Sequence, residues 1–198
     1  MSPDNARLGA ARESARLICE QGINDYRLAK DKALERLGMQ RGPAPSNQEV
    51  ADCVAEHLAL FEAQESQERL QRMRAIALKA MALCAPFQPR AAGAIVNGLA
   101  TARSPVQLHL FCAFDEQVDL HLGDNQIPFD TGERRLRRPN GQELRCPTCV
   151  FIADGIEVEL LIFGEDDIRW SPLSPIDGKP MQRLALADFR KLSEAAGG

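Results

Sequence analysis

Apolar residues in the first 85 positions recur every three or four residues, which is the period of amphipathic helices. Four such stripes follow one another along the chain. They pass through Leu8, Ala11, Ala15 and Ile18; Tyr26, Ala29, Ala33 and Leu37; Val50, Cys53, Val54 and Leu58; and Leu70, Met73, Ile76, Ala77, Ala80, Met81 and Cys84. Asn47 stands just before the third stripe and is expected to cap its helix. The pattern therefore predicts a helical region over residues 1–85.

The pattern changes after Pro86, where shorter apolar runs alternate with turn residues. Asn140-Gly141 and Asp154-Gly155 each separate two extended runs, and such dipeptides indicate hairpin turns. The expected strands cover residues 106–111, 134–138, 143–152 and 156–163, and the expected helices cover 115–122 and 184–192. The predicted fold class is α+β, in which a helical region is followed by a small mixed sheet with helices on one face, over residues 86–198.

Two glycines precede the first of these strands. Gly93 and Gly98 lie five residues apart with apolar residues between them, and Ser104 follows Gly98 by six. A glycine ahead of a helix lets the backbone approach an anion, and the first free N–H groups of that helix can receive a phosphate. The spacing resembles the signature of the polymerase-beta-like minimal nucleotidyltransferases, which have a Gly-Ser turn, a second glycine and a Ser-Asp-x-Asp strand. The resemblance covers residues 86–165.

The resemblance implies a nucleotide site in which the two metal-binding aspartates have been replaced. In that family the two strand aspartates hold divalent cations that bridge the nucleotide phosphates, and Mg²⁺ favours carboxylate ligands. Pro105 and Gln107 stand at these two positions here. The resemblance also marks the residues expected to contact a nucleotide, which are Gly93, Ala94, Gly98, Ser104 and Gln107.

Carboxylates on a later strand are candidates for the third acidic position of the family. Glu157 and Glu159 alternate with apolar residues and share one face of the expected strand, as Gln107 and His109 share one face of theirs. One interpretation is a relic site of Ser104, Gln107, His109 and Glu159. If activity survives, Glu157 and Glu159 are the expected catalytic carboxylates, with Glu159 as metal ligand, and His109 is expected to act as a base or as a further metal ligand. The alternative is a solvated sheet face.

Four arginines crowd one expected strand in an otherwise acidic half of the chain. Guanidinium groups bind phosphate oxygens in pairs of hydrogen bonds, so that either Arg135 and Arg137 or Arg134 and Arg138 could face a nucleotide. Arg135 and Arg137 are the pair assigned to the candidate site. The alternative is that a charged strand protects the edge of the sheet from association.

Charge and cysteine content restrict the classes of function. The net charge is −4, and residues 91–198 carry 11 Lys and Arg against 16 Asp and Glu, which argues against nonspecific nucleic-acid binding. No run approaches the roughly 18 apolar residues that span a bilayer. The six cysteines are scattered, and the lone pair Cys146 and Cys149 lacks the second pair that a structural zinc site needs. These features predict a cytoplasmic protein without a membrane segment.

Three functions remain open at this point. The first is a degenerate nucleotidyltransferase-fold protein that binds a nucleotide or phosphate, or regulates, without efficient catalysis. The second is an active, divergent nucleotidyltransferase that uses Mg²⁺. The third is a helical interaction protein in which residues 1–85 pair with a partner or form a homodimer.

Overall fold

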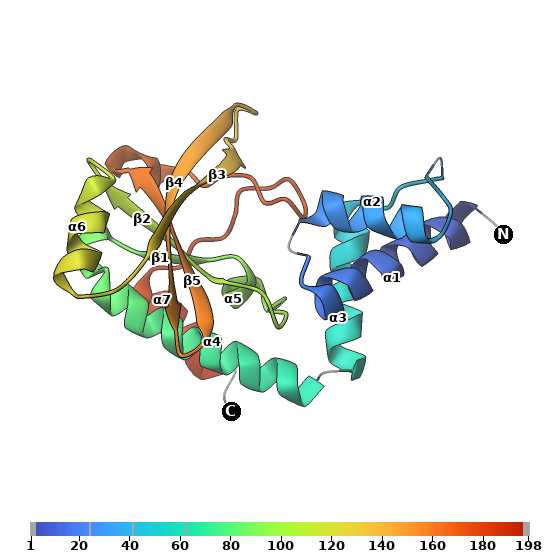
Figure 1. The fold of residues 1–198 in the computed structure, drawn as a ribbon, viewed down its shortest axis with the longest axis horizontal. Helices are drawn as coiled ribbons and strands as arrows, with labels where there is room; N and C mark the ends of the chain where they lie inside the picture. Colours follow the sequence, from blue (N-terminus) through green and yellow to red (C-terminus); the bar gives the residue numbers. More distant parts are fainter. Residues whose placement is uncertain (1–2, 24, 41, 62, 196–198) are drawn as a thin grey trace. The chain divides into compact units, whose positions relative to one another are not determined.

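The computed structural model describes residues 3–23, 25–40, 42–61 and 63–195. The chain divides into two compact units. We call residues 1–69, 99–104 and 175–178 the helical unit, and residues 70–98, 105–174 and 179–198 the sheet unit. The elements are labelled in Figure 1, and the fold class is α+β, as the sequence predicts. No helix within the described residues has both the length and the apolar character needed to cross a membrane.

The helical unit contains α1 (Pro3–Gln21), α2 (Tyr26–Arg36) and α3 (Asn47–Phe61). Small side chains on α1 and α2, among them Ala11, Ala15 and Ala29, are buried and allow the helices to approach closely. The start of α3 differs from the expectation that Asn47 caps it. Ser46 Oγ accepts a hydrogen bond from Glu49 N–H at 3.1 Å, and Glu49 Oε2 accepts one from Ser46 N–H at 2.8 Å. This reciprocal pair is a capping box.

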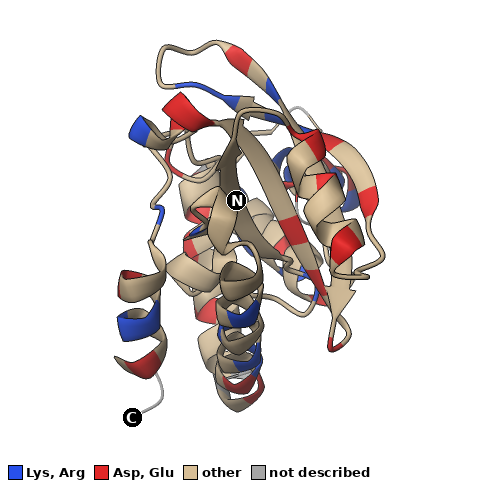
Figure 2. Ribbon diagram, turned by 90° about the vertical axis from the view of Figure 1, so that its left-hand side faces the viewer, with Lys and Arg blue, Asp and Glu red and all other residues tan. Residues whose placement is uncertain are grey.

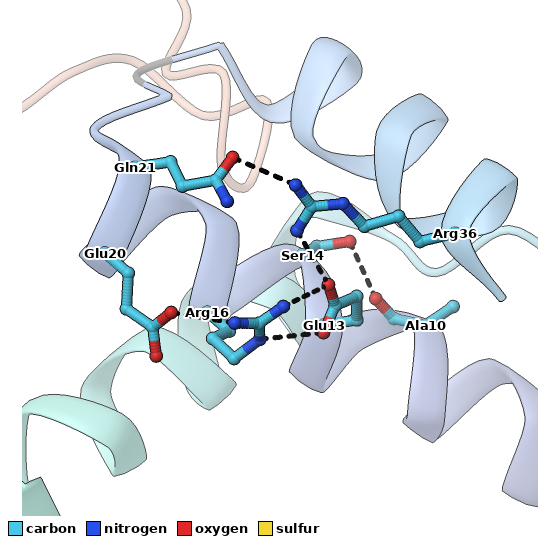
Figure 3. Close-up of polar contacts among 7 residues, drawn as sticks. All are labelled: Ala10, Glu13, Ser14, Arg16, Glu20, Gln21 and Arg36. Carbon is cyan, nitrogen blue, oxygen red and sulfur yellow. Dashed lines mark hydrogen bonds and ion pairs between the residues drawn. The ribbon is translucent and has the colours of Figure 1, made fainter.

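Polar contacts between α1 and α2 centre on Glu13 (Figure 3). Its carboxylate accepts hydrogen bonds from Arg16 at 2.8 and 2.9 Å and from Arg36 at 3.2 Å. Arg16 also donates to Glu20, and Arg36 to Gln21. The hydrogen bond from Arg16 is the largest cause of the lowered pKa of Glu13. The network joins the solvent side of the two helices, whose apolar sides pack in the core.

Helix α4 (Ala63–Leu83) belongs for most of its length to the sheet unit, so the unit boundary at residue 69 differs from the expected boundary at residue 85. The apolar stripe of α4 is buried, including Met73, Ala77 and Met81. Arg74 on the same helix donates from Nε to the carbonyl oxygen of Ile95 at 3.0 Å. Both the stripe and this hydrogen bond attach α4 to elements that follow it in the chain.

Five strands form one mixed sheet in the order β1-β2-β5-β4-β3. Strands β2 and β5 are parallel, and all other neighbours are antiparallel. The strands are β1 (Arg90–Ala92), β2 (Val106–Cys112), β3 (Asp130–Arg137), β4 (Glu143–Ala153) and β5 (Ile156–Gly164). The turns at Asn140-Gly141 and Asp154-Gly155 join β3 to β4 and β4 to β5, which confirms both expected hairpins.

The sheet has two faces of different character. Val106, Leu108 and Leu110 are buried on what we call the helix face, where Cys149 Sγ donates to Asp119 of α6 (Glu116–Asp124) at 3.1 Å. Helices α4, α6 and α7 (Leu186–Ala195) lie beside the sheet in Figure 1. The remaining short elements are α5 (Ala94–Asn97) and the 3₁₀ turns Ala85–Phe87 and Glu165–Arg169.

The opposite face, which we call the site face, carries Gln107, His109 and Phe111 on β2, since successive strand residues point to opposite sides. Phe111, Leu161 and Phe163 form an apolar cluster on this face, and Trp170 packs against it from the segment after β5. This cluster covers the part of the site face near the carboxyl ends of β2 and β5. The part near Gln107 includes the exposed Ile152 of β4.

Candidate functional site

The glycine turn lies directly beside the first residues of β2. Ala92, the last residue of β1, pairs with Gln107, and Gly93 follows it with φ of +68°. A Cβ atom built on Gly93 would lie 2.9 Å from Gln107 Oε1, so that only glycine fits this position without a shift of Gln107. Gly98 ends α5 in the left-handed conformation, with φ of +82°, which glycine adopts at low cost. The spacing of the two glycines is thus explained by backbone geometry and close packing.

The contact of Ala94 with a phosphate stays a prediction. Ala94 begins α5, which is a single turn, and the N–H groups of Val96 and Asn97 both donate to the carbonyl oxygen of Gly93. Ser104 belongs to the helical unit, where its hydroxyl accepts a hydrogen bond from Thr101 N–H at 3.0 Å. That contact gives Ser104 a local role in the turn that precedes β2.

Gln107 and Glu159 lie opposite each other on the parallel strands β2 and β5. Gln107 Nε2 donates to Glu159 Oε2 at 3.1 Å. Arg134 of β3 donates to both carboxylate oxygens of Glu159, from Nε at 2.8 Å and from Nη2 at 2.9 Å. The side chain of Glu159 is 8% exposed and that of Arg134 44% exposed. A nearly buried carboxylate is thus neutralised by a guanidinium that reaches it from the solvent side.

These residues do not fit a divalent cation. Glu159 is the expected ligand, but both of its oxygens are held by Arg134, and Gln107 offers only an amide beside it. Two-metal phosphoryl transfer requires several anionic oxygens to hold the cations. Across the described ranges, no three His, Cys, Asp or Glu side chains are grouped so that they could hold a metal ion. The assignment of Glu159 as a metal ligand is therefore corrected.

His109 is fully buried beside Phe163, with ring centroids 4.9 Å apart. Its Nδ1 accepts a hydrogen bond from Arg183 Nε at 2.7 Å. Burial, followed by the nearby Arg183 charge, lowers the pKa of His109 well below 6.5, so the ring is neutral. A side chain with no access to solvent and with one nitrogen occupied cannot serve as the expected base or metal ligand. His109 is instead a structural residue of the sheet.

Lowering the pH should decrease the stability of the protein, because the His109 ring is neutral in the folded state. Below about pH 6.5 the unfolded chain protonates His109 while the folded chain does not, so we expect the unfolding free energy to decrease by up to about 1.4 kcal/mol per pH unit from this group. At higher pH the ring is neutral in both states and contributes no pH dependence. Urea unfolding at several pH values measures the slope. His109→Gln should reduce it, and a slope in His109→Gln equal to that of the wild type would contradict the assignment.

Arg183 anchors the segment that covers the apolar part of the site face. Besides His109, its guanidinium donates to the carbonyl oxygens of Asp167 and Trp170. It also lies over the rings of Phe163 and Phe111, at 4.5 and 5.0 Å from their centroids. Burial lowers the pKa of Arg183 to about 10. Sequence reasoning missed Arg183, because a single basic residue in a turn-rich tail carries no periodic signal.

Among the remaining expected site residues, Arg135 and Arg137 lie on the face opposite Glu159, whereas Glu157 shares its face. Arg135 and Arg137 point to the helix face, since they alternate with Arg134, and Arg135 pairs with Glu143 at 3.8 Å. They do not face Gln107, so the assigned arginine pair is corrected, and Arg134 is the arginine that reaches this position. Glu157 is exposed and lies just beyond the end of the pairing between β2 and β5.

Cys146 and Cys149 point to opposite faces of β4, as residues three apart on a strand must. Cys146 Sγ donates to the carbonyl oxygen of Ile162 at 3.2 Å, and Cys149 Sγ donates to Asp119. Burial raises the pKa of each thiol to about 12. The two sulfur atoms therefore cannot share a metal ion or react together.

A hollow of about 320 Å³ lies near the carboxyl ends of β2 and β5. Asp115, Glu116 and Asp167 are among its lining residues. Acidic residues also occupy α6, which has no lysine or arginine, whereas the hairpin of β3 and β4 carries both signs (Figure 2). The three carboxylates of the lining outnumber its one basic residue, Arg145. Because such a lining would repel a phosphate, we do not place a nucleotide in this hollow.

The helical unit exposes several large apolar side chains, each at least 43% exposed: Leu8, Leu28, Leu37 and Leu60. Isolated exposed leucines are common on protein surfaces. A homodimer through these helices stays a prediction.

No family model matches this chain, and neither does any of the curated proteins or solved structures compared with it.

Proposed function

We propose that residues 86–198 form a nucleotidyltransferase-like domain that has lost metal-dependent catalysis and acts as a nucleotide- or phosphate-binding, or regulatory, domain. The proposal starts from the resemblance of the segment from Gly93 to Gln107. Two features of the fold support it: Gly93 lies against Gln107, and Gln107 lies in register with Glu159 on the neighbouring parallel strand. These are the neighbours that the resemblance requires.

The observation that carries the loss of catalysis is the double hydrogen bond between Arg134 and Glu159. The guanidinium supplies one positive charge at the carboxylate where the resemblance implies a cation. It cannot stabilise both the attacking and the leaving oxygen of a phosphoryl transfer, as a pair of metal ions does. The active alternative would require Arg134 to leave Glu159 and further anionic ligands to enter.

Nucleotide binding without Mg²⁺ is the expected result. Isothermal titration of the full chain with ATP, GTP, CTP and UTP, each with Mg²⁺ and with a chelator, should show equal affinity in both conditions for whichever nucleotide binds. No transfer of the nucleotidyl group is expected under either condition. Ala94→Asp should weaken binding, because it places a carboxylate where the resemblance puts a phosphate, whereas Ala94→Ser should preserve it.

Glu157→Gln and Glu159→Gln form a matched pair for the same titration, since both remove one charge from β5. Binding that depends on Mg²⁺ and disappears only in Glu159→Gln would favour the active alternative. Absence of binding by all four nucleotides at millimolar concentration would reject a nucleotide-binding role.

A further inference from the structure

We infer that the hollow near the carboxyl ends of β2 and β5 binds a small organic cation, an ammonium group carried on an apolar body. We call it the end hollow. It lies at the opposite end of β2 from Gln107, about 16 Å further along the strand. The inference therefore goes beyond the proposed function and does not depend on it.

The end hollow lies where the chain leaves two neighbouring parallel strands in opposite directions. After β2 the chain passes to the helix face, where Asp119 of α6 accepts a hydrogen bond from Cys149. After β5 it passes to the site face, where Trp170 packs against the apolar cluster. In open sheets with parallel strands, such a divergence leaves a crevice outside the carboxyl ends of the strands, and ligands bind there. The volume of about 320 Å³ suits a small ligand.

The charges of the lining select a cation. Among the described residues, no basic side chain pairs with Asp115 or Glu116, which are both exposed. Asp115 is the N-cap of α6, but its side chain makes no cap hydrogen bond, so its carboxylate is available to a ligand. Arg145 is occupied by Glu133 at 3.5 Å. The first amide groups of α6 carry about half a positive charge, which the two carboxylates exceed.

The field of the carboxylates reaches the wall of the end hollow. Cys112, the last residue of β2, belongs to the lining and is buried. Burial raises the pKa of its thiol to about 11, and the charges of Asp115 and Glu165 add to the rise. A field that disfavours a thiolate favours an ammonium group at the same place.

Apolar side chains of the lining favour an organic cation over a metal ion. Leu144, Pro147 and Phe163 belong to the lining, together with Phe114, whose side chain is 68% exposed. An ammonium group gains from ion pairs and from the face of an aromatic ring, and the body that carries it gains from apolar contact. A metal ion would instead need several oxygen, nitrogen or sulfur ligands around it, and within the described ranges no such group of side chains is found.

The test is a nuclear magnetic resonance titration of the isotope-labelled full chain with phenethylammonium chloride. We expect saturable shifts of the amide signals of residues 112–116, with a dissociation constant on the order of 1 mM, as suits a ligand of about nine non-hydrogen atoms. The neutral isostere 2-phenylethanol should bind at least about fivefold more weakly, because it forms no ion pair.

Two pairs of substitutions separate the end hollow from general surface charge. Asp115→Asn/Glu116→Gln should weaken phenethylammonium binding at least about fivefold. Asp124→Asn/Asp130→Asn removes the same charge from exposed positions outside the lining, so it should change the affinity by less than about twofold at physiological salt. All four positions are exposed, and circular dichroism checks that the variants fold.

Equal affinity for the amine and the alcohol, an equal loss in both pairs of variants, or no saturable shift up to about 20 mM amine would each overturn the inference. A further titration with Nα-acetyl-lysine methylamide identifies the source of the cation. Binding tighter than that of phenethylammonium indicates a lysine of a partner protein, and weaker binding indicates a free amine. Because these variants leave Gln107 and Glu159 unchanged, this inference and the proposed function can fail separately.

Discussion

Arg183→Met should lower the unfolding free energy by about 3 kcal/mol, because it removes a charged donor from three acceptors at once. The acceptors are His109 Nδ1 and the carbonyl oxygens of Asp167 and Trp170. His109 is fully buried, so its nitrogen cannot recover a hydrogen bond from solvent. Methionine preserves much of the apolar contact with the two phenylalanine rings, and the loss is therefore mainly polar.

Chemical denaturation measures this change, and Arg190→Met provides the control. Arg190 lies on α7 and is exposed, so its replacement should alter stability by less than about 0.5 kcal/mol. A loss in Arg183→Met no larger than in Arg190→Met would show that the guanidinium does not hold the segment after β5. Near-ultraviolet circular dichroism of Trp170 gives a local readout of the same event.

Arg134→Met should destabilise the protein by about 2–3 kcal/mol, because Glu159 is left buried without its counter-ion. This expected destabilisation is smaller than that of breaking a fully buried ion pair. The Arg134 side chain is 44% exposed, so water screens part of the interaction. Glu159→Gln alone removes the charge and should cost less. In the double variant Arg134→Met/Glu159→Gln the two losses of unfolding free energy should not add. Each substitution already removes the partner whose charge makes the other substitution costly.

A double-mutant cycle in urea measures the coupling energy between the two residues. Arg135→Met is the matched control, because it is the neighbouring arginine on the same strand but points to the other face. Additive effects of Arg134→Met and Glu159→Gln would mean that the ion pair between the two side chains contributes nothing measurable to stability.

Local patterns allowed much of the sheet unit to be predicted. The strand at residues 106–111 and the two hairpins follow from alternation and from the dipeptides Asn140-Gly141 and Asp154-Gly155, which act over a few residues only. Strand β3 begins at Asp130, four residues before the expected strand. This start was missed because the first residues of the strand are polar and exposed, so they form no apolar alternation. Sequence alternation alone gave no indication of strand there.

Long-range pairing set the limits of the prediction. Alternation separates Arg134 from Arg135, but it does not say which of them faces Glu159, since that depends on the order of strands β3, β4 and β5. The attachment of α4 to the sheet unit likewise depends on Arg74 and Ile95, which are 21 residues apart. The expected adjacency of Gln107 and Glu159 came from the resemblance, and periodicity alone would not have supplied it.

Strand β3 ends the sheet on the side away from β1. Its Arg137 carbonyl oxygen accepts a hydrogen bond from Leu173 N–H at 2.8 Å, so one end of the strand is occupied by the chain itself. Along the rest, Glu133 and Arg135 present charges that an incoming strand would have to desolvate. Fibrillar stacking through this border is therefore disfavoured, and concentrated solutions should stay clear most readily at low ionic strength, where these charges are least screened.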